Sequence, residues 1–220
     1  MALSYIASYT LIDLIHKMEN GSISTPAFNR GFVWQQELIK RLFESIDKGY
    51  PIGTIIAVKG DSIQFDSSLS ETSKFPNPKN NGYSNESTIW IIDGTQRLSA
   101  LYNILRSGSL GLDLYYQVNI GEFTFDIDNE NSRYTINMSD IFNSKSFMDA
   151  QVRFASFSEE ERGELIEKLN AVHKRFQYYQ VPVQVISEVN NDEIREIFMR
   201  LNMSGLALSK SEIDNAKGSK

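Results

Sequence analysis

A short segment near the middle of the chain combines an acidic residue, a glycine and an arginine where two predicted elements meet. The apolar run 88–92 predicts a buried strand, and it ends at Asp93 and Gly94, a pair typical of turns. An apolar pattern at helical spacing follows, with Gln96 and Arg97 in its first turn. The start of a helix favours anions through its free N–H groups and its dipole. Because Gly94 lets a phosphate approach the backbone and Arg97 offers a planar set of donors, the segment predicts a site for nucleotide phosphate.

Asp93 and Gln96 each have two interpretations, and the sequence leaves both open. The carboxylate of Asp93 could bind Mg²⁺, directly or through water, or act as a base that positions an attacking water. Aspartate is equally common as the cap of a helix. Gln96 could orient that water or read a base, or it could be a solvated residue of the first turn. For Arg97 we favour a phosphate ligand over an exposed surface arginine.

The composition is that of an ordinary globular protein without thiol chemistry. The chain has 220 residues, 41% of them hydrophobic, and no cysteine, which excludes a disulfide framework. Its two histidines, His16 and His173, are far apart, so a metal centre built on His and Cys is not expected. No apolar run reaches the roughly 18 residues of a membrane span, and the first residues lack the basic start of a signal peptide. We therefore expect a cytoplasmic protein that does not enter a membrane.

The charge balance limits the ways in which the chain could contact nucleic acid. A formal net charge of -6 argues against a surface that wraps DNA or RNA, because phosphate neutralisation needs clustered Lys and Arg. A local basic patch, or DNA contact through another domain or a partner chain, stays compatible with this charge. The sequence leaves open whether the chain forms a homo-oligomer.

Helices and strands are mixed without a regular strand–helix–strand rhythm, which predicts the α+β class. We expect a single domain over residues 1–220 with a mobile loop at 66–87, where Ser, Asn, Pro and Lys are frequent. Pro182 indicates that its strand lies at a sheet edge or near a bulge. The predicted helices follow Thr10, span 35–48, follow Gly94, span 158–177 and 191–201, and begin at Ser209, and the predicted strands span 54–58, 62–65, 88–92, 112–118, 121–127, 134–138 and 181–186.

Three segments, taken in order, resemble a known family. They are Phe-Asn-Arg-Gly-Phe-Val-Trp at 28–34 with the following helix to 53, Asp-Gly-Thr-Gln-Arg-Leu at 93–98, and Phe-Met-Arg-Leu-Asn-Met-Ser-Gly-Leu-Ala-Leu-Ser at 198–209. Together they are similar to the N-terminal domain of GmrSD-type modification-dependent restriction enzymes and related phage-defence proteins, whose signature is Asp-Gly-Gln-Gln-Arg. The resemblance covers nearly the whole chain.

The resemblance implies a ParB/sulfiredoxin-like fold, a mixed sheet flanked by helices, that binds and often hydrolyses a nucleoside triphosphate. The phosphate-binding Gly-x-x-Arg box of that superfamily matches Gly94 to Arg97. The resemblance further implies cofactor contacts at Gly94, Thr95 and Arg97. It also implies catalytic roles for Asp93 and Gln96, with Mg²⁺ bound at Asp93. Thr95 stands where the signature has glutamine, which leaves the role of that side chain open.

Two further residues of the family motifs are candidates for nucleotide contact. The family carries an arginine at the position of Arg30, which could be a second phosphate clamp. The alternative is a buried ion pair inside a loop anchored by aromatic neighbours. Asn202 could touch the nucleotide with its amide, or it could belong to the stop signal of a helix.

The main hypothesis is an NTP-binding, NTP-hydrolysing sensor or regulatory domain of a DNA-targeting restriction or phage-defence system. The alternative is a non-catalytic DNA- or protein-recognition module that has lost nucleotide chemistry. The family commonly carries a C-terminal HNH-type nuclease domain, and we expect it to be absent from this sequence, so hydrolysis would gate a nuclease in a missing domain or partner chain. A nuclease activity of this domain itself is disfavoured, because its carboxylates are scattered. The P-loop motif is absent from the sequence, which excludes a P-loop NTPase.

Overall fold

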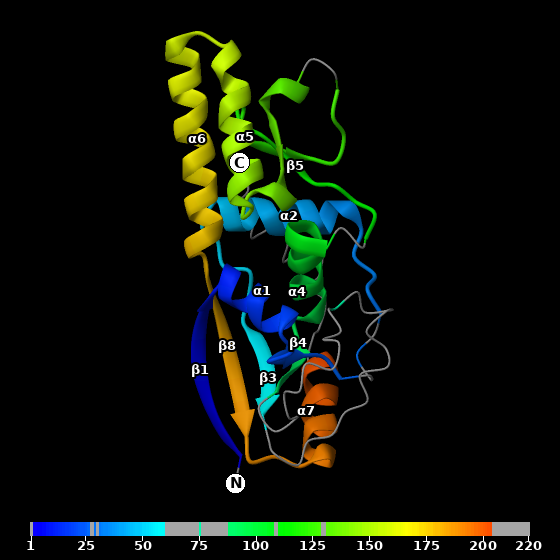
Figure 1. The fold of residues 1–220 in the computed structure, drawn as a ribbon. Coiled ribbons are helices and arrows are strands. Elements are labelled where there is room, and N and C mark those ends of the chain that lie inside the picture. The colour runs from blue at the N-terminus through cyan, green and yellow to red at the C-terminus, as the bar shows by residue number, and fades with distance from the viewer. Residues whose placement is uncertain are drawn as a thin grey trace, which may run out of the picture.

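A mixed five-stranded sheet forms the base of the molecule (Figure 1). The computed structural model describes residues 2–26, 29, 31–59, 75, 88–107, 110–128 and 131–203. The strand order is β1-β8-β3-β4-β2, with β8 parallel to β3 and β2 parallel to β4, while the other neighbours are antiparallel. The strands are β1 Leu3–Thr10, β2 Ile23–Ser24, β3 Ile55–Lys59, β4 Ile89–Asp93 and β8 Gln180–Ser187.

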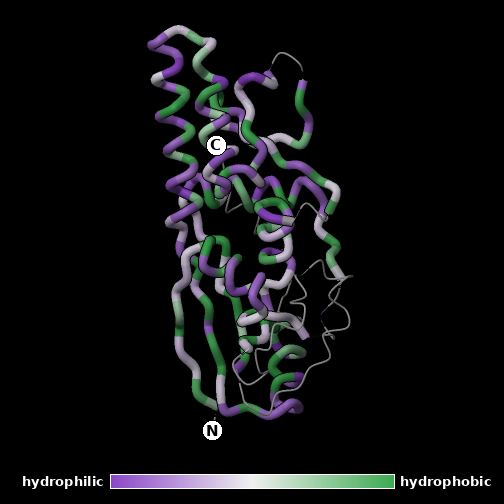
Figure 2. Tube along the Cα trace, in the orientation of Figure 1, coloured by the Kyte–Doolittle hydropathy of each residue, from purple (hydrophilic) through white to green (hydrophobic). Residues whose placement is uncertain are grey.

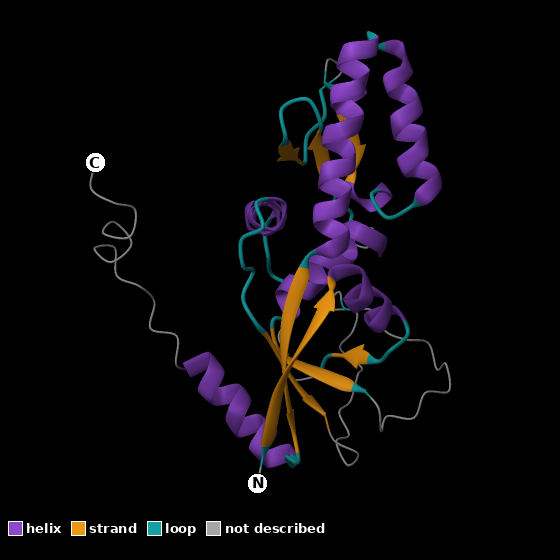
Figure 3. Ribbon diagram, turned by 90° about the vertical axis from the view of Figure 1, so that its left-hand side faces the viewer, coloured by secondary structure: helices purple, strands orange, loops and turns teal. Residues whose placement is uncertain are grey.

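Helices cover both faces of this sheet. On one face, α1 (Leu11–Glu19) and α4 (Thr95–Tyr102) bury Leu14 and Leu98 against the odd-numbered residues of β8. On the other face, α7 (Asn191–Met203) packs Ile194 against Trp90 and Ile92 of β4. Figure 3 shows α7 lying apart from the other helices, on its own side of the sheet. The α+β class is thereby confirmed, and the ParB/sulfiredoxin-like character stays a prediction.

A second layer of helices and a small antiparallel sheet stands above the five-stranded sheet in Figure 1. The small sheet has the order β6-β5-β7. Figure 2 shows hydrophobic residues along β8 and β3, whereas hydrophilic residues dominate the far end of α6, which begins with three glutamates. The elements are α2 Gln36–Asp47, β5 Tyr115–Gln117, β6 Glu122–Thr124, β7 Thr135–Asn137, α5 Ser144–Arg153 and α6 Glu159–Tyr178, with a π-helical turn at Asn103–Ser107 and 3-10 turns at Ser132–Tyr134, Met138–Asp140 and Phe154–Ser156.

An aromatic cluster ties this upper layer together. Phe43 of α2, Phe123 of β6 and Phe176 of α6 are buried, with ring centroids 5.5 to 6.1 Å apart. Such tilted and edge-on contacts add to the stabilisation from area burial. The fully buried ring of Phe43 therefore connects α2 to β6 of the small sheet and to α6.

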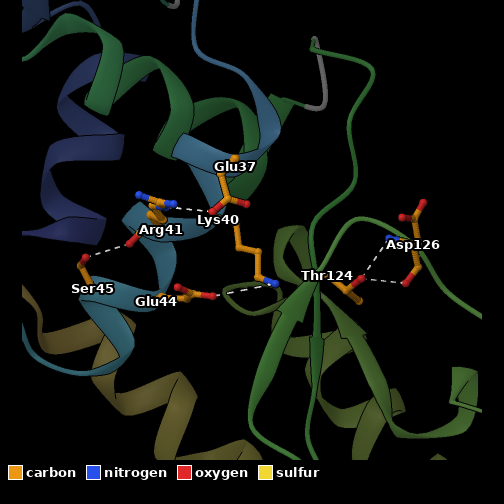
Figure 4. A network of polar contacts seen from close by, with 7 residues as sticks. All are labelled: Glu37, Lys40, Arg41, Glu44, Ser45, Thr124 and Asp126. Carbon is orange, nitrogen blue, oxygen red and sulfur yellow. Dashed lines mark hydrogen bonds and ion pairs between the residues drawn. The ribbon is translucent and has the colours of Figure 1, made fainter. Parts of the chain in front are cut away.

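The outward side of α2 carries ion pairs between residues four apart. Arg41 Nε lies 2.8 Å from Glu37 Oε1, and Lys40 Nζ lies 3.9 Å from Glu44 Oε1 (Figure 4). Pairs of this kind at a surface stabilise by about 0.3–0.5 kcal/mol. The position of α2 is therefore set by its buried side, not by these charges.

Several helix boundaries predicted from capping patterns are confirmed. The N–H of Asp13 donates to Thr10 Oγ1 at 3.2 Å, so Thr10 caps α1. The N–H of Glu161 donates to Ser158 Oγ at 3.3 Å, so Ser158 caps α6. Gly49, just after α2, has the left-handed φ of 68° that suits glycine.

Other expectations were wrong or fall outside the described residues. β1 and α5 were not predicted, and α7 continues through Met203, so Asn202 lies inside the helix. The strand that contains Pro182 is not an edge strand, because β8 lies between β1 and β3. The pairing of β8 with β3 begins at Val183, one residue after Pro182. No residue of β3 therefore needs an N–H from Pro182. The predicted strand 62–65, most of the predicted loop 66–87 and the predicted helix from Ser209 lie outside the described residues.

We expect Phe43→Ala to destabilise the protein by about 3–5 kcal/mol, because it removes a fully buried ring from the aromatic cluster. Urea unfolding monitored by circular dichroism measures the loss. Leu38→Ala on the same helix is the matched control, since Leu38 is 46% exposed, and it should change the free energy of unfolding by less than about 0.5 kcal/mol. Equal effects of the two substitutions would contradict the assignment of Phe43 to the core.

Candidate functional site

A sharp turn joins β4 to α4, and the backbone there requires glycine. Gly94 has φ 97° and ψ 4°, a left-handed conformation that side chains disfavour. A Cβ at Gly94 would lie 2.4 Å from Ile55 Cδ1. The register between β3 and β4 also shifts at this point, since Ile56 pairs with Asp93 but Ala57 pairs with Ile91. Such irregularities redirect side chains at strand ends, and here Asp93 is left half-exposed at the surface.

The first turn of α4 receives no hydrogen bond from a side chain of its N-cap residue. Its N-cap residue is Gly94, and the N–H of Leu98 is bonded to Gly94 O at 3.1 Å. The N–H groups of a helix's first turn precede its internal ladder and need outside partners. Gly94 has no side chain that could supply such a partner.

Arg97 lies across this turn, and protein acceptors surround its guanidinium. Nη1 donates to Ile52 O at 2.7 Å, and Nη2 donates to Thr54 O at 3.2 Å. Nη2 also donates to Asp93 Oδ2 at 3.2 Å, which makes an ion pair. Burial lowers the pKa of Arg97, and the charge of Asp93 opposes this shift. Arg97 thus ties the segment before β3 to the start of α4.

The segment bridged by Arg97 is fixed from its other side by Tyr179. The Tyr179 hydroxyl donates to Tyr50 O at 2.6 Å and accepts from the N–H of Ile52 at 3.1 Å. Gly53 lies between Ile52 and Thr54, the two residues whose carbonyls bind Arg97. Its φ is 86°, and a Cβ there would be only 2.5 Å from Arg97 Nη1. The guanidinium therefore rests against backbone that has no side chain to displace it.

Gln96 holds a second segment against the same turn. Its Oε1 accepts from the N–H of Val33 at 2.9 Å, and its Nε2 donates to Gly31 O at 3.0 Å. The amide is thus bonded on both sides to the backbone of residues 31–33. This use is neither of the two interpretations that the sequence offered for Gln96, and it positions the loop that follows Arg30.

Asn29 is a buried hub that sequence reasoning missed. Its Nδ2 lies 2.9 Å from Thr95 Oγ1, 2.9 Å from Ile91 O and 2.6 Å from Thr25 Oγ1, so its two N–H groups are shared among three acceptors. Asn29 and Thr95 are each only 7% exposed, so these bonds replace water that cannot reach them. The one available signal was the place of Asn29 beside Arg30 in the first family motif.

The chain matches the family model described as the GmrSD restriction endonuclease, N-terminal domain, over residues 11–217. It belongs to this family. It is also similar to the uncharacterized protein MJ0686 of Methanocaldococcus jannaschii, with 23% identity over 235 residues that cover 92% of the chain. The chain spans about 40% of the length of that relative. Membership in the GmrSD N-terminal family places the chain among the parts of restriction and phage-defence proteins.

The structure of this GmrSD family member brings most of the predicted site residues together. Residues 93–97 form one turn, and Asn29 with residues 31–33 lies against it. Arg30 lies outside the described residues. Its neighbours Asn29 and Gly31 are bonded to Thr95 and Gln96 of this turn. Asn202 lies in the last turn of α7. This helix covers the face of the sheet opposite to the one that α4 covers. The structure therefore does not place Asn202 on the face that carries the turn.

Metal-ligating residues are sparse around the turn. The described part of the chain contains no group of three or more His, Cys, Asp or Glu that could hold a metal ion. His173 Nδ1 lies 2.8 Å from Ile141 O, and His16 Nε2 lies 3.2 Å from Arg106 Nη2, so both histidines have partners elsewhere.

Within the described residues, no helix is long and apolar enough to cross a membrane.

We expect Gly53→Ala to cost more stability than Gly49→Ala, by about 1 kcal/mol, because the new methyl displaces Arg97 from Ile52 O. Both glycines have a positive φ, but a Cβ at Gly49 meets nothing within 4 Å. Gly49→Ala thus reports the backbone strain alone. Thermal unfolding of both variants, each also made in an Arg97→Ala background, measures the difference. The extra cost at Gly53 should vanish in that background, and its persistence would contradict the contact.

Proposed function

We propose that this domain binds a nucleoside triphosphate at the start of α4, and that hydrolysis of the nucleotide regulates a DNA endonuclease of a restriction or phage-defence system. The observation that carries the proposal is a helix start whose N-cap, left-handed Gly94, has no side chain, with Arg97 and Asp93 beside it. Free N–H groups, a helix dipole and a guanidinium favour the same ligand, an oxyanion such as phosphate.

The bonds of Arg97 differ in a way that suits exchange with a ligand. The bond from Nη1 to Ile52 O is short, at 2.7 Å, and holds the guanidinium in place. The contact from Nη2 to Asp93 is longer, at 3.2 Å, and the Asp93 side chain is 50% exposed. A phosphate oxygen can therefore replace the Asp93 carboxylate at Nη2 while Arg97 stays anchored. Arg97 would serve the fold and the ligand at once.

Release of Asp93 by the phosphate would leave a free carboxylate beside the bound anion. Mg²⁺ is bound in proteins through one or two carboxylates, waters and substrate phosphates. One half-exposed aspartate next to a phosphate site fits that donor set, and it does not fit the multi-ligand set that zinc needs. Asp93 would thus help to hold Mg²⁺ only when the nucleotide is present.

Hydrolysis needs a water in line with the terminal phosphorus. The water oxygen forms a new bond to that phosphorus, the bond to the bridging oxygen breaks, and the water gives up its proton. Asp93 could accept the proton or orient the water, and Arg97 would stabilise the charge on the phosphoryl oxygens. Gln96 would act through residues 31–33, which it holds, and a second phosphate clamp at Arg30 stays a prediction. A contact of Asn202 with the nucleotide stays a prediction.

One observation favours the alternative of a non-catalytic recognition module. Gln96 is bonded to backbone on both sides, and both terminal nitrogens of Arg97 already have protein acceptors. Residues with such structural duties persist in a domain even when it has lost nucleotide chemistry. Binding measurements therefore decide between the two functions.

Titration with ATP, GTP, CTP and UTP in the presence of Mg²⁺ by calorimetry tests the proposal. We expect binding of at least one nucleotide and a loss of about tenfold or more in affinity for Arg97→Ala, since a charge-assisted pair to phosphate is removed. Arg41→Ala is the matched control, because Arg41 also pairs with a carboxylate four residues away but lies on α2. Thermal unfolding confirms that each variant is folded at the temperature of titration. An unchanged affinity in folded Arg97→Ala would show the phosphate assignment to be wrong, and no binding by the wild type would favour the recognition module.

Asp93→Asn should separate anion binding from metal binding. Without Mg²⁺, we expect the variant to bind nucleotide about two- to fivefold more tightly than the wild type, because Arg97 loses a competing charge. With Mg²⁺, the gain in affinity that the metal gives the wild type should disappear. Calorimetry in EDTA and in excess Mg²⁺ measures both effects. The same Mg²⁺-dependent gain in both proteins would exclude Asp93 as a metal ligand.

A further inference from the structure

The edge of the five-stranded sheet opposite β2 is formed by β1. All of its eight residues pair with β8 on one side, and no strand pairs with its other side among the described residues. Figure 1 shows β1 at the margin of the sheet. Its apolar side chains are unusually open, with Leu3 54%, Tyr5 49% and Ile6 73% exposed.

This edge lacks the features by which proteins prevent strand addition. Natural edge strands are usually short, or they carry lysine, proline or a bulge. β1 reads Leu-Ser-Tyr-Ile-Ala-Ser-Tyr-Thr, with no charged residue and no proline, and its register with β8 is unbroken. The strand is therefore suited to pair with a further strand.

The register of β1 with β8 indicates which backbone groups point outward. In an antiparallel ladder, pairs that exchange hydrogen bonds alternate with pairs that do not. Ser8 is opposite Pro182, which has no N–H, so this pair belongs to the second kind. By alternation, Ser4, Ile6 and Ser8 direct their N–H and C=O groups away from β8, toward the open edge.

We propose that β1 pairs with β1 of a second copy of this chain, antiparallel across a twofold axis at Ile6. This register joins outward-pointing residues only, because Ser4 faces Ser8 of the other copy and Ile6 faces its own equivalent. A register centred on Ala7 would overlap equally far, but only the axis at Ile6 sets the most exposed apolar side chain of the strand against its own equivalent. It also sets Tyr5 opposite Ala7 and Leu3 opposite Tyr9, so that the exposed apolar side chains of each copy cover those of the other.

The chemistry of the strand favours a second copy over another protein. A twofold axis requires a self-complementary surface, and a strand with no charges meets no like-charge repulsion when it pairs with itself. Pairing would join the two sheets into one continuous sheet with β1 in its interior. The net charge of -6 on each copy opposes the approach of two copies, so added salt should tighten the pairing.

The residue on the proposed axis allows a test of both partner and register. Sedimentation velocity over a dilution series should show a dimer for the full wild-type chain. Ile6→Lys and Ile6→Glu should each raise the dissociation constant of the dimer by about tenfold or more, because two like charges then meet at the axis. An equimolar mixture of the two variants should dimerise again, since the axis would then hold an ion pair. Ile120→Lys is the control, because Ile120 is 59% exposed but lies in the turn between β5 and β6, and it should leave the dimer intact.

Three outcomes would overturn the proposal. One is a wild-type chain that stays monomeric at every concentration and salt level. Another is a dimer that both charged variants leave unchanged. The last is failure of the mixed variants to recover the dimer although circular dichroism shows both to be folded, which would exclude a twofold axis at Ile6.

Discussion

The partly buried guanidinium of Arg97 is the interaction on which the rest of the site depends. A buried charge is costly unless hydrogen bonds and an opposite charge compensate for it. The side chain of Arg97 is 18% exposed, and its compensation comes from two carbonyls before β3 and from the carboxylate that ends β4. Those three acceptors come from two segments that are far apart in the sequence. Satisfying one cation therefore fixes the geometry between β3, β4 and the first turn of α4.

The backbone around Arg97 is shaped to admit it. Both Gly53 and Gly94 have a positive φ, and a Cβ on either would press on the guanidinium. The hydroxyl of Tyr179 fixes the same segment from the side of α6 and β8. The loop that follows β2 is bonded to the same turn, because its Asn29 contacts Thr95 and its Gly31 accepts from Gln96. Four separate segments thus converge on one helix start, and side chain to backbone hydrogen bonds make most of the connections.

Much of this arrangement could be predicted from the sequence, for reasons that are local. The strand-to-helix junction at Asp93 and Gly94 is visible because an apolar run stops at a turn pair before helical spacing begins. The caps Thr10 and Ser158 are visible because capping depends on residues three apart. The roles of Gln96 and Arg97 are not visible in this way, because their partners are carbonyl and N–H groups that every residue carries. Only the fold determines which of these groups lie within reach.

The same reason explains the strand that was missed and the proline that was misplaced. β1 has no strict alternation of polar and apolar residues, because as an edge strand it lies largely outside the core on both faces. Pro182 indicates only that one N–H is absent, and an interior strand tolerates this where its neighbour has not yet begun. Residue type therefore constrains the hydrogen bonds of a strand more directly than its place in the sheet.

The acidic character of the chain bears on how a nucleotide would reach the site. A net charge of -6 repels a nucleoside triphosphate at long range, so attraction has to come from groups within a few ångströms. The N–H groups at the start of α4 would act at that range, and so would Arg97 once a phosphate had displaced Asp93. A nucleotide that arrives with Mg²⁺ carries less negative charge and brings a partner for the displaced carboxylate. Among the described residues Arg97 is the one cation bonded at this turn, so in an acidic domain Mg²⁺ would assist the approach of the nucleotide as well as its binding.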